Sequence, residues 1–251
     1  MSSLAGKVAL ITGGARGMGA SHARVMLGEG AQVMIGDIDD EAGRMLAEEL
    51  GPDARYVHLD VTSPVDWRAA VDRTVAEFGS LSVLVNNAGI LNHGSIDEYT
   101  LEQWNAIMAV NVTGTFLGIS AAVDALRVSA PSSVINMSST DGLIGSVGRF
   151  GYTASKFAIT GLTKSLALEL ASDGVRVNSV HPGGVRTGMT GGIDEKAAPW
   201  AMRRFADPTE ISALVAYLAS DRSSFSTGSS FVADGGLTAG TASIPPSSGA
   251  I

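Results

Sequence analysis

The chain of 251 residues contains no cysteine, and charged residues make up only 17% of it. The absence of cysteine excludes disulfides, thiolate nucleophiles and zinc sites with cysteine ligands. The four histidines, His22, His58, His93 and His181, show no metal-ligand spacing, so we expect no metal site. Few charges combined with 45% hydrophobic residues exclude a disordered chain and predict a sizeable buried core.

Long apolar runs and a net positive charge are also missing. No apolar run approaches the ~18–20 residues that span a bilayer, and the first apolar stretch, Val8 to Ile11, is too short for a secretory signal. The net charge of −8 would repel phosphate backbones, which disfavours nucleic-acid binding. These absences predict a soluble cytoplasmic protein that binds neither membrane nor nucleic acid.

Short β-branched runs alternate with longer helical patterns along the chain. Strands are predicted at residues 7–12, 32–37, 55–59, 83–86, 134–137, 176–180 and 230–232, and helices at 17–28, 40–50, 64–79, 102–128, 152–172 and 208–220. Strands this apolar are buried on both faces, which a parallel sheet between two helical layers requires. We expect a single α/β domain over residues 1–251 with a seven-stranded parallel sheet. The tail at 238–251 has no period and is expected to lie along the surface or a neighbouring subunit.

Glycine is abundant, with 31 residues, and four glycines gather after the first predicted strand. The segment is Thr12-Gly-Gly-Ala-Arg-Gly-Met-Gly19, a tight turn that leads into a helix. Backbone without side chains can approach a pyrophosphate there, and the helix start offers N–H groups and a favourable dipole. Gly13 and Gly17 are two residues further apart than the first two glycines of the common G-x-G-x-x-G pattern, and glycine at such a turn can also serve geometry alone.

Asp37 ends the second predicted strand, 20 residues after Gly17 (37 − 17). A carboxylate here can accept hydrogen bonds from the adenosine ribose and repels a 2′-phosphate, which favours NAD over NADP. Arg16 in the glycine loop would favour NADP through the same phosphate. Because the carboxylate opposes the phosphate directly while the arginine can turn to solvent, we expect NAD. A role of Asp37 as a helix cap or loop acid is the alternative.

Tyr152 and Lys156 stand four residues apart at the start of a predicted helix, so both side chains can face one site. A free tyrosine, with a pKa near ~10, is a poor base at neutral pH. A fixed cation nearby favours the phenolate and would lower this pKa. A lone Tyr-x-x-x-Lys pair also fits an ordinary amphipathic helix, so the other motifs decide between the two interpretations.

These motifs occur in a fixed order along the chain. They are Thr12–Gly19, Asp60-Val61, Asn86-Asn-Ala-Gly89, Asn111, Asn136-Met-Ser-Ser139, Tyr152 with Lys156, Pro182-Gly183 and Asp234-Gly-Gly236. With this series the chain resembles the short-chain dehydrogenase/reductase family from about Leu4 to Leu237. Within it, the stretches 13–19, 54–61 and 177–183 are most similar to bacterial NAD-dependent hydroxysteroid dehydrogenases of the 3α/20β type. The resemblance implies a Rossmann fold, NAD as cofactor, and a homotetramer with helices 102–128 and 152–172 as dimerisation surfaces.

The resemblance also implies four catalytic residues, Asn111, Ser139, Tyr152 and Lys156. Tyr152 would take the alcohol proton while hydride passes to the nicotinamide, and Ser139 would hydrogen-bond the substrate oxygen. Lys156 would bind the nicotinamide ribose and lower the tyrosine pKa. Asn111 would hold a water that relays protons to Lys156, a role compatible with a buried asparagine that bonds helix backbone. Ser139 precedes the tyrosine by the family's thirteen residues (152 − 139), and Ser138 is its alternative.

The implied cofactor site draws on the ends of several strands. Its members are Gly13, Arg16, Gly17, Met18, Gly19, Asp37, Asp60, Val61, Asn87, Tyr152, Lys156, Val185 and Thr187. Asp60 and Val61 would contact adenine, although Asp60 can equally cap the turn that follows it. Val185 and Thr187 would meet the nicotinamide carboxamide. Asn87 would lie at the switch point of the sheet, whereas Asn86 is expected to tie neighbouring strands together.

The segment at 188–204 is predicted to be a substrate flap, because three glycines can hinge it and four of its residues offer apolar surface. Apolar residues expected to line the pocket are Met189, Ile193, Trp200 and Met202 in the flap, and Leu91, Leu143, Ile144 and Phe150 elsewhere. Such walls suit an apolar ketone or secondary alcohol. The alternative for the flap is an ordinary exposed helix pair with one buried tryptophan. His93 either bonds a polar group of the substrate or is a solvated loop residue.

The sequence thus predicts an enzyme, an NAD-dependent oxidoreductase that interconverts a secondary alcohol and a ketone on a bulky apolar, hydroxysteroid-type substrate. One alternative is a 3-oxoacyl carrier-protein reductase that uses NADPH, which Asp37 disfavours. The other is a non-catalytic NAD-sensing protein, which need not retain all four catalytic residues.

Overall fold

The computed structural model of the chain describes residues 3–191 and 200–240. Its seven strands form one sheet in the order β3-β2-β1-β4-β5-β6-β7, and every neighbouring pair is parallel. The strands are β1 (Val8–Thr12), β2 (Gln32–Asp37), β3 (Ala54–His58), β4 (Val83–Asn86), β5 (Ser132–Met137), β6 (Val175–Pro182) and β7 (Ser230–Ala233). The predicted seven-stranded parallel sheet is confirmed. The largest differences in strand ends are two residues, at the start of β5 and the end of β6.

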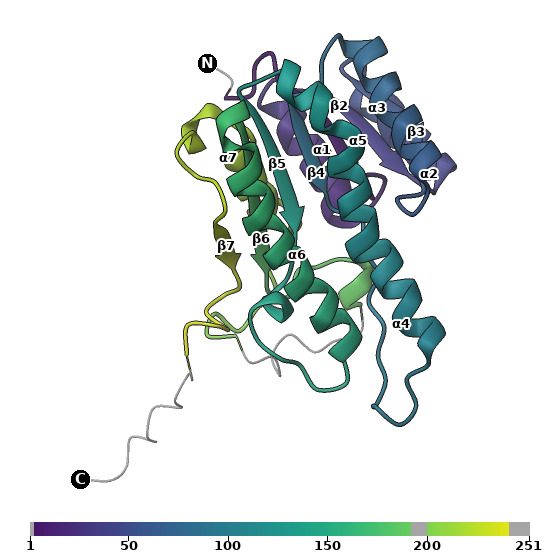
Figure 1. The fold of residues 1–251 in the computed structure, drawn as a ribbon, viewed down its shortest axis with the longest axis vertical. Helices are drawn as coiled ribbons and strands as arrows, with labels where there is room; N and C mark the ends of the chain where they lie inside the picture. The colour runs from purple at the N-terminus through teal and green to yellow at the C-terminus, as the bar shows by residue number, and fades with distance from the viewer. Residues whose placement is uncertain (1–2, 192–199, 241–251) are drawn as a thin grey trace, which may run out of the picture.

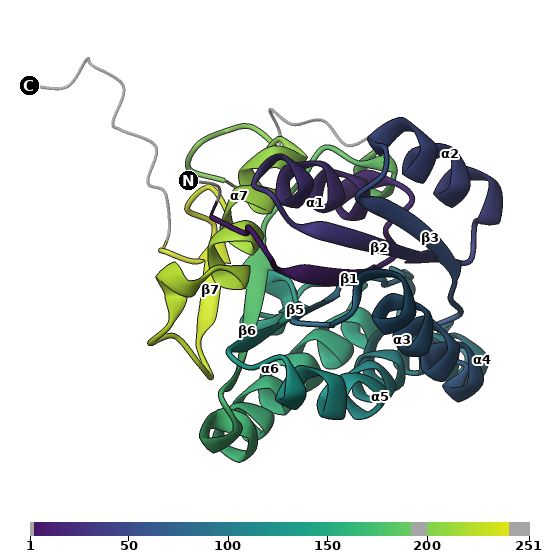
Figure 2. The ribbon, with the colours of Figure 1, turned by 90° about the horizontal axis from the view of Figure 1, so that it is seen from above.

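Helices cover both faces of the sheet (Figure 2). One face carries α1 (Gly17–Gly28), α2 (Asp40–Leu50) and α7 (Pro208–Ala219), and the other carries α3 (Pro64–Phe78), α4 (Leu101–Met108), α5 (Gly114–Val128) and α6 (Phe150–Leu170). Successive residues of β1 point to opposite layers, so Leu10 belongs to one hydrophobic cluster and Ile11 to the other. Both are fully buried, which explains why the strands read as continuous apolar runs.

The helix predicted at 102–128 is interrupted in its middle. A π-helical turn, Ala109–Thr113, separates α4 from α5 and contains the buried Asn111. The amide of Asn111 donates to the carbonyl of Ile90 (3.0 Å) and accepts from its N–H (2.9 Å). These bonds to the loop after β4 compete with regular helix geometry, and π turns of this kind often mark functional sites.

The same segment corrects the expectation that nothing in the chain is apolar enough to cross a membrane. By length and composition, the helical stretch Leu101–Val128 qualifies, and 39% of its most apolar window is buried inside the protein. Part of its apolar surface is accounted for by the core, because Ile119, Ala122 and Leu126 pack in the cluster beneath α5.

The carboxyl ends of all seven strands meet at one edge of the sheet, toward which the arrows of β5 and β7 point in Figure 1. The chain runs outward from β1 to β3 and then returns to place β4 on the other side of β1. This reversal opens a crevice between the loops that follow β1 and β4, where open α/β sheets bind ligands. The fold therefore points to this edge as the functional one.

Packing between α5 and α3 can be tested at Gly118. A Cβ at this position would lie 2.5 Å from Trp67 and 2.8 Å from the Asn86 Oδ1. Gly118→Ala should therefore lower the free energy of unfolding by about 1–3 kcal/mol through overpacking, as measured by urea denaturation. Gly28→Ala is the matched control, because no described atom lies within 4 Å of its Cβ. Its higher helix propensity should raise stability by up to about 1 kcal/mol. Equal effects of the two variants would contradict the packing described.

Candidate active site

The loop between β1 and α1 exposes a surface of backbone. Gly13 and Gly17 adopt φ angles of +58° and +55°, in the left-handed region that residues with side chains rarely occupy. A Cβ on Gly19 would lie only 2.0 Å from the Gly13 carbonyl oxygen and 2.8 Å from Asn87 Nδ2. These positions leave no room for side chains of their own, and the resulting cradle lets a ligand approach the main chain closely.

The start of α1 is open to an anion. Asp39 and Ser63 cap α2 and α3, which leave the same edge, whereas no described side chain caps α1. The first N–H groups of a helix need acceptors from outside it, and phosphate groups are favoured acceptors at this position. Together with the glycine cradle, this helix start fits the pyrophosphate of a dinucleotide.

Asp37 holds the glycine loop in place. Its Oδ2 accepts the N–H of Ala15 and its Oδ1 accepts the N–H of Asp39, both at 3.0 Å. The alternative of a loop acid therefore describes part of what Asp37 does. Arg16 turns toward a different carboxylate, since its Nη2 lies 2.5 Å from Asp39 Oδ2. The guanidinium that would attract a 2′-phosphate is thus paired with an acid.

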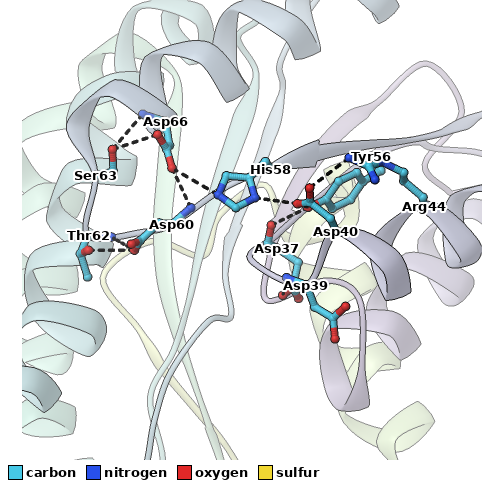
Figure 3. Close-up of polar contacts among 10 residues, drawn as sticks. All are labelled: Asp37, Asp39, Asp40, Arg44, Tyr56, His58, Asp60, Thr62, Ser63 and Asp66. Atoms are coloured by element: carbon cyan, nitrogen blue, oxygen red, sulfur yellow. Dashed lines mark hydrogen bonds and ion pairs between the residues drawn. The ribbon is translucent and has the colours of Figure 1, made fainter.

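The adenine end of the predicted cofactor site is acidic and highly connected (Figure 3). Asp60 Oδ1 accepts hydrogen bonds from the N–H and the hydroxyl of Thr62, each at 2.8 Å. Asp60 thus caps the following turn, as its alternative role requires. Its own N–H donates to Asp66 Oδ2 at 3.1 Å, which ties the end of β3 to the first turn of α3. The neighbouring Val61 accepts the indole N–H of Trp67 at 2.9 Å.

His58 connects this end of α3 to α2. Its ring nitrogens lie 2.6 Å from Asp40 Oδ1 and 3.8 Å from Asp66 Oδ2 (Figure 3). The Tyr56 hydroxyl is 2.6 Å from the same Asp40 oxygen and 2.8 Å from the Asp37 carbonyl. Hydrogen bonds from Tyr56 and His58 hold the pKa of Asp40 below its usual range. Asp37 therefore sits in a network that continues to the Asp60 turn.

Asn87 crosses the switch point between β1 and β4. Its Nδ2 donates to the carbonyls of Thr12 (2.8 Å) and Gly13 (3.1 Å). Its Oδ1 is buried and accepts no hydrogen bond from the residues that the structure describes. A buried acceptor beside the glycine cradle fits a sugar hydroxyl of a bound dinucleotide. Asn86, in contrast, donates to Asn136 Oδ1 at 2.8 Å and links β4 to β5, as predicted.

The loop after β6 covers the other side of the cradle. A Cβ on Gly17 would lie 3.6 Å from the Thr187 methyl carbon, so these two loops face each other. Val185 is buried and forms a parallel bridge with Ala206. The predicted cofactor residues from the ends of β1, β4 and β6 are thus brought together at one edge.

Ser139, Tyr152 and Lys156 form one cluster, where Ser139 follows the end of β5 and the other two residues lie near the start of α6. Ser139 hydrogen-bonds the Tyr152 side chain, and the Lys156 ammonium lies 5.3 Å from the centre of the tyrosine ring. Lys156 is 4% exposed, and its Nζ donates to the carbonyl of Met137 at 2.9 Å. Ser138 points elsewhere, because its hydroxyl donates to the main-chain carbonyl of Lys156 at 3.0 Å.

Burial dominates the electrostatics of this cluster. Removal of the Tyr152 hydroxyl from water raises its pKa to about 12, and this effect exceeds the lowering by Ser139. In the protein alone, burial therefore outweighs the groups that lower the tyrosine pKa, and the lowering by Lys156 beside a bound nicotinamide stays a prediction. Burial also lowers the pKa of Lys156 to about 8. Further positive charge beside the phenol is needed to make it a base near neutral pH.

Asn111 uses its whole amide within the protein. Besides its two bonds to Ile90, its Nδ2 donates to the Ser155 hydroxyl at 3.0 Å. The residue therefore fixes the loop after β4 against α6. A Cβ on Gly89 would lie 3.3 Å from Asn111 Oδ1 and 3.6 Å from Lys156 Nζ, so Asn111 lies close to the catalytic lysine. The water relay through Asn111 stays a prediction.

His181 is a neighbour of the cluster that the sequence did not identify. Its Nδ1 lies 2.9 Å from the Ser139 carbonyl and its Nε2 lies 2.8 Å from the Ser179 hydroxyl. Since a carbonyl can only accept, Nδ1 carries the proton and Nε2 accepts from the serine. Burial lowers the pKa of His181 and keeps the ring neutral. Linear spacing gives no signal for this contact, because 42 residues separate His181 from Ser139.

Asp141 is a second neighbour that the sequence did not identify. It lies in the turn after β5, is 5% exposed, and donates its N–H to the Ser139 hydroxyl oxygen at 3.1 Å. Its carboxylate accepts from Ser146 Oγ at 2.7 Å and lies 3.9 Å from the Arg149 guanidinium. An acid two residues after the predicted catalytic serine is visible in the sequence, but its burial and its bond to the 143–149 loop are not.

The loops on the predicted substrate side contact each other above this cluster. The rings of Tyr99 and Phe150 are 4.5 Å apart, and the N–H of Gly94 donates to the Gly148 carbonyl at 3.1 Å. His93 is exposed, which agrees with a solvated loop position. Leu91 and Leu143 are half-buried, and Ile144 is exposed.

The predicted flap at 188–204 is described in part. A 3-10 turn, Gly188–Thr190, begins it, and Ile193 with the rest of 192–199 lies outside the described residues. Trp200 packs edge-on against Phe205 with ring centres 4.8 Å apart, which agrees with the alternative of a packed tryptophan. Met189 and Met202 are exposed. Of the predicted tail, residues 241–251 lie outside the described residues as well, whereas Thr238 bonds to Asp234.

Comparisons with known proteins agree with this site. The family model described as enoyl-(acyl carrier protein) reductase matches residues 13–238. A 3-alpha-(or 20-beta)-hydroxysteroid dehydrogenase of Mycobacterium tuberculosis is 59% identical over 239 residues, which cover 95% of this chain and 92% of that protein. A trans-4-hydroxycyclohexanecarboxylate dehydrogenase of Sinomonas cyclohexanicum is 47% identical, covering 94% and 95%. A cyclopentanol dehydrogenase of Comamonas testosteroni is 41% identical, covering 93% and 97%.

These relatives are similar over nearly their whole length, and the matched region contains the glycine loop, the Ser139 turn and the Tyr152–Lys156 helix. The motif series and the parallel sheet lead to the same family as the overall similarity. The chain belongs to the short-chain dehydrogenase/reductase family of oxidoreductases.

Proposed function

We propose that this protein is an NAD(H)-dependent oxidoreductase that interconverts a secondary alcohol and a ketone on a bulky cyclic apolar substrate of the hydroxysteroid type. The observation that carries the proposal is the Ser139–Tyr152–Lys156 cluster at the same sheet edge as the glycine cradle. A bound nicotinamide would accept or supply the hydride. Its ring carries a positive charge in the oxidised form, which is the further cation that the tyrosine requires.

Each residue of the cluster has a separate task. In oxidation, the Tyr152 oxygen takes the proton from the alcohol, and in reduction its hydroxyl returns that proton to the substrate oxygen. Ser139 donates a hydrogen bond to the same oxygen and stabilises the charge that develops there. Lys156 provides a buried positive charge behind the tyrosine and a donor for ribose hydroxyls. Because the tyrosine must be deprotonated for oxidation, this direction should become faster as pH rises, and reduction should become slower.

The preference for NAD is supported by two carboxylates at the end of β2. Asp37 opposes a 2′-phosphate directly, and Asp39 neutralises the one loop arginine that would attract it. Both effects act in the same direction. The alternative of an NADPH-dependent 3-oxoacyl carrier-protein reductase requires the opposite charge balance at this position.

The substrate class is supported by the relatives and by the loops above the cluster. The relatives are named for steroid and cyclic alcohol substrates. In this chain, Leu91, Leu143 and Ile144 lie on the same loops as the aromatic contact of Tyr99 with Phe150. Such walls favour an apolar ring over a sugar or a charged acid. A spectrophotometric NADH screen across steroid, terpenoid, aryl and acyl ketones tests the class, and turnover confined to acyl thioesters would refute it.

A homotetramer in the cytoplasm is part of the proposal. The outer surfaces of α5 and α6 are apolar, with Phe116, Phe157 and Leu168 exposed by 52%, 46% and 86%. Exposed apolar surface on two neighbouring helices is typical of a subunit interface. A subunit interface on α5 would also cover exposed apolar surface of the helical stretch Leu101–Val128, which is long enough to span a membrane. A tetrameric mass in size-exclusion chromatography with light scattering is the expected result.

The role of Tyr152 is tested by Tyr152→Phe. Loss of the proton donor and acceptor should reduce turnover by about 10²-fold or more, while NADH binding followed by fluorescence persists. Tyr217→Phe removes a hydroxyl from α7 and serves as the control with unchanged turnover. Near-normal turnover of Tyr152→Phe would refute the assignment. Turnover lost together with NADH binding would instead indicate a disrupted fold.

Cofactor choice is tested by Asp37→Asn, which keeps the size of the side chain but removes its charge. The KM for NAD should rise and that for NADP should fall, since the repulsion of the 2′-phosphate is relieved and Arg16 lies nearby. Asp53→Asn makes the same charge change at an exposed position and should alter neither constant. A wild-type protein that prefers NADPH would overturn the proposed cofactor.

The support that His181 gives to Ser139 is tested by His181→Ala. This change removes one of the two donors to the Ser139 carbonyl and leaves the Gly142 N–H (2.9 Å), and we expect roughly a tenfold fall in kcat and a loss of about 1–3 kcal/mol in unfolding free energy. His181→Asn can still donate from an amide nitrogen close to the position of Nδ1 and should restore part of the rate. If alanine and asparagine lower kcat equally, the hydrogen bond to Ser139 is not what matters.

A further inference from the structure

Asp141 carries a buried carboxylate that takes no part in the proposed reaction. Its Oδ1 accepts a hydrogen bond from Ser146 Oγ at 2.7 Å. Its Oδ2 is buried and accepts no hydrogen bond within the described ranges 3–191 and 200–240, and it forms a long ion pair with Arg149 at 3.9 Å. Removing a carboxylate from water is costly unless all its lone pairs are satisfied. An incompletely paired buried charge therefore needs an explanation.

Anchoring of the loop does not explain the charge. The bond from Ser146 holds the 143–149 loop against the turn after β5, but the amide oxygen of an asparagine would accept the same bond. An asparagine would do so without a buried charge, and at lower desolvation cost. The negative charge itself is thus the feature to be explained.

The position of Asp141 places this charge beside the catalytic cluster. Its N–H bonds the Ser139 hydroxyl oxygen, and its ion-pair partner Arg149 directly precedes α6, three residues before Tyr152. We propose that Asp141 is a positioning residue that acts through its charge, and that it sets the pH range in which Tyr152 and Lys156 carry out proton transfer. This inference rests on the proposed function of the same site.

The charged groups around the cluster support one direction of this effect. The negative charge of Asp141 raises the pKa of Tyr152 and also opposes the lowering of the Lys156 pKa by burial. Arg149 acts on the tyrosine in the opposite sense. His181 faces Lys156 from β6, and its pKa is lowered by burial, so it adds no positive charge at neutral pH. Asp141 thus keeps the lysine charged and the tyrosine protonated up to higher pH.

The sign of the effect is the same on both limbs of a pH profile. Oxidation requires Tyr152 to lose its proton and Lys156 to keep its own. A negative charge raises both pKa values, so removing it must move both limbs to lower pH. At an effective dielectric near ~20, a unit charge moves a pKa by roughly 0.5–1 unit from about 12–24 Å away and by more from closer, so a displacement of at least roughly 0.5 pH unit is expected.

The test compares Asp141→Asn with Ser146→Ala in the full-length protein, with NAD and a cyclic secondary alcohol. Asp141→Asn removes the charge and keeps an acceptor for Ser146; kcat/KM against pH should move to lower pH by at least roughly 0.5 unit, with little change in KM for the alcohol. Ser146→Ala keeps the charge and removes the loop anchor; it should raise KM for the alcohol and leave the profile in place. Arg149→Gln removes a positive charge and should move the profile to higher pH.

The outcomes separate this inference from the proposed function. If the wild-type protein oxidises the alcohol and Asp141→Asn gives the same profile, the inference is overturned and the proposed function stands. If Ser146→Ala moves the profile as far as Asp141→Asn does, loop anchoring explains the effect and the inference is again wrong. A wild-type protein inactive on every cyclic alcohol overturns both. Should Asp141→Asn fail to fold, Asp141→Ser removes the same charge and takes its place, and an unchanged profile of that variant overturns the inference.

Discussion

Burial of the Lys156 ammonium is the constraint on which the catalytic edge depends. A buried cation is stable only with good hydrogen-bond partners. The Lys156 Nζ donates a hydrogen bond to the carbonyl of Met137 at the end of β5. This bond joins α6 to the strand that carries Ser139, and so it fixes the distance between tyrosine and serine. Burial has a cost, because it lowers the pKa of the lysine to about 8 and raises that of Tyr152 to about 12. The site therefore needs other charges to bring both groups into a working range.

A layer of polar side chains between β5, β6 and α6 supports this arrangement. Asn136 donates to the Thr163 hydroxyl at 2.9 Å, and Ser138 donates to the carbonyl of Lys156. His181 holds the carbonyl of Ser139 from β6. Fully paired polar groups in a core define one geometry more strictly than apolar packing does. The geometry of the proposed catalytic cluster thus depends on hydrogen bonds from residues that lie outside the cluster.

The cofactor side of the edge follows a different principle. There the glycine loop offers bare backbone and an uncapped helix, while carboxylates gather where β2 and β3 end. Asp37 and Asp60 bond their own loops, and His58 and Tyr56 connect them through Asp40 and Asp66 (Figure 3). The positive helix start suits a pyrophosphate, and the acidic rim suits sugar hydroxyls and not a further phosphate. Within one crevice, the helix start therefore favours the anionic part of a dinucleotide and the acidic rim favours its neutral sugar.

Much of this protein is determined locally in its sequence. Apolar runs such as Val8–Thr12 require burial on both faces, and glycines 13, 17 and 19 satisfy backbone angles and approaches that other residues cannot. These features predicted the parallel sheet, the loop and, through the ordered motifs, the family. The spacing of Tyr152 and Lys156 likewise depends only on one helical turn.

Tertiary structure decided what depends on contacts between distant segments. The π turn contains Asn111, whose amide bonds a loop 21 residues away, and burial in the packed chain raises the pKa of Tyr152. His181 and Asp141 became visible as neighbours of Ser139 only when β5, β6 and the 143–149 loop were assembled. Desolvation and long-range hydrogen bonds are properties of the packed chain, and no linear pattern of residues encodes them.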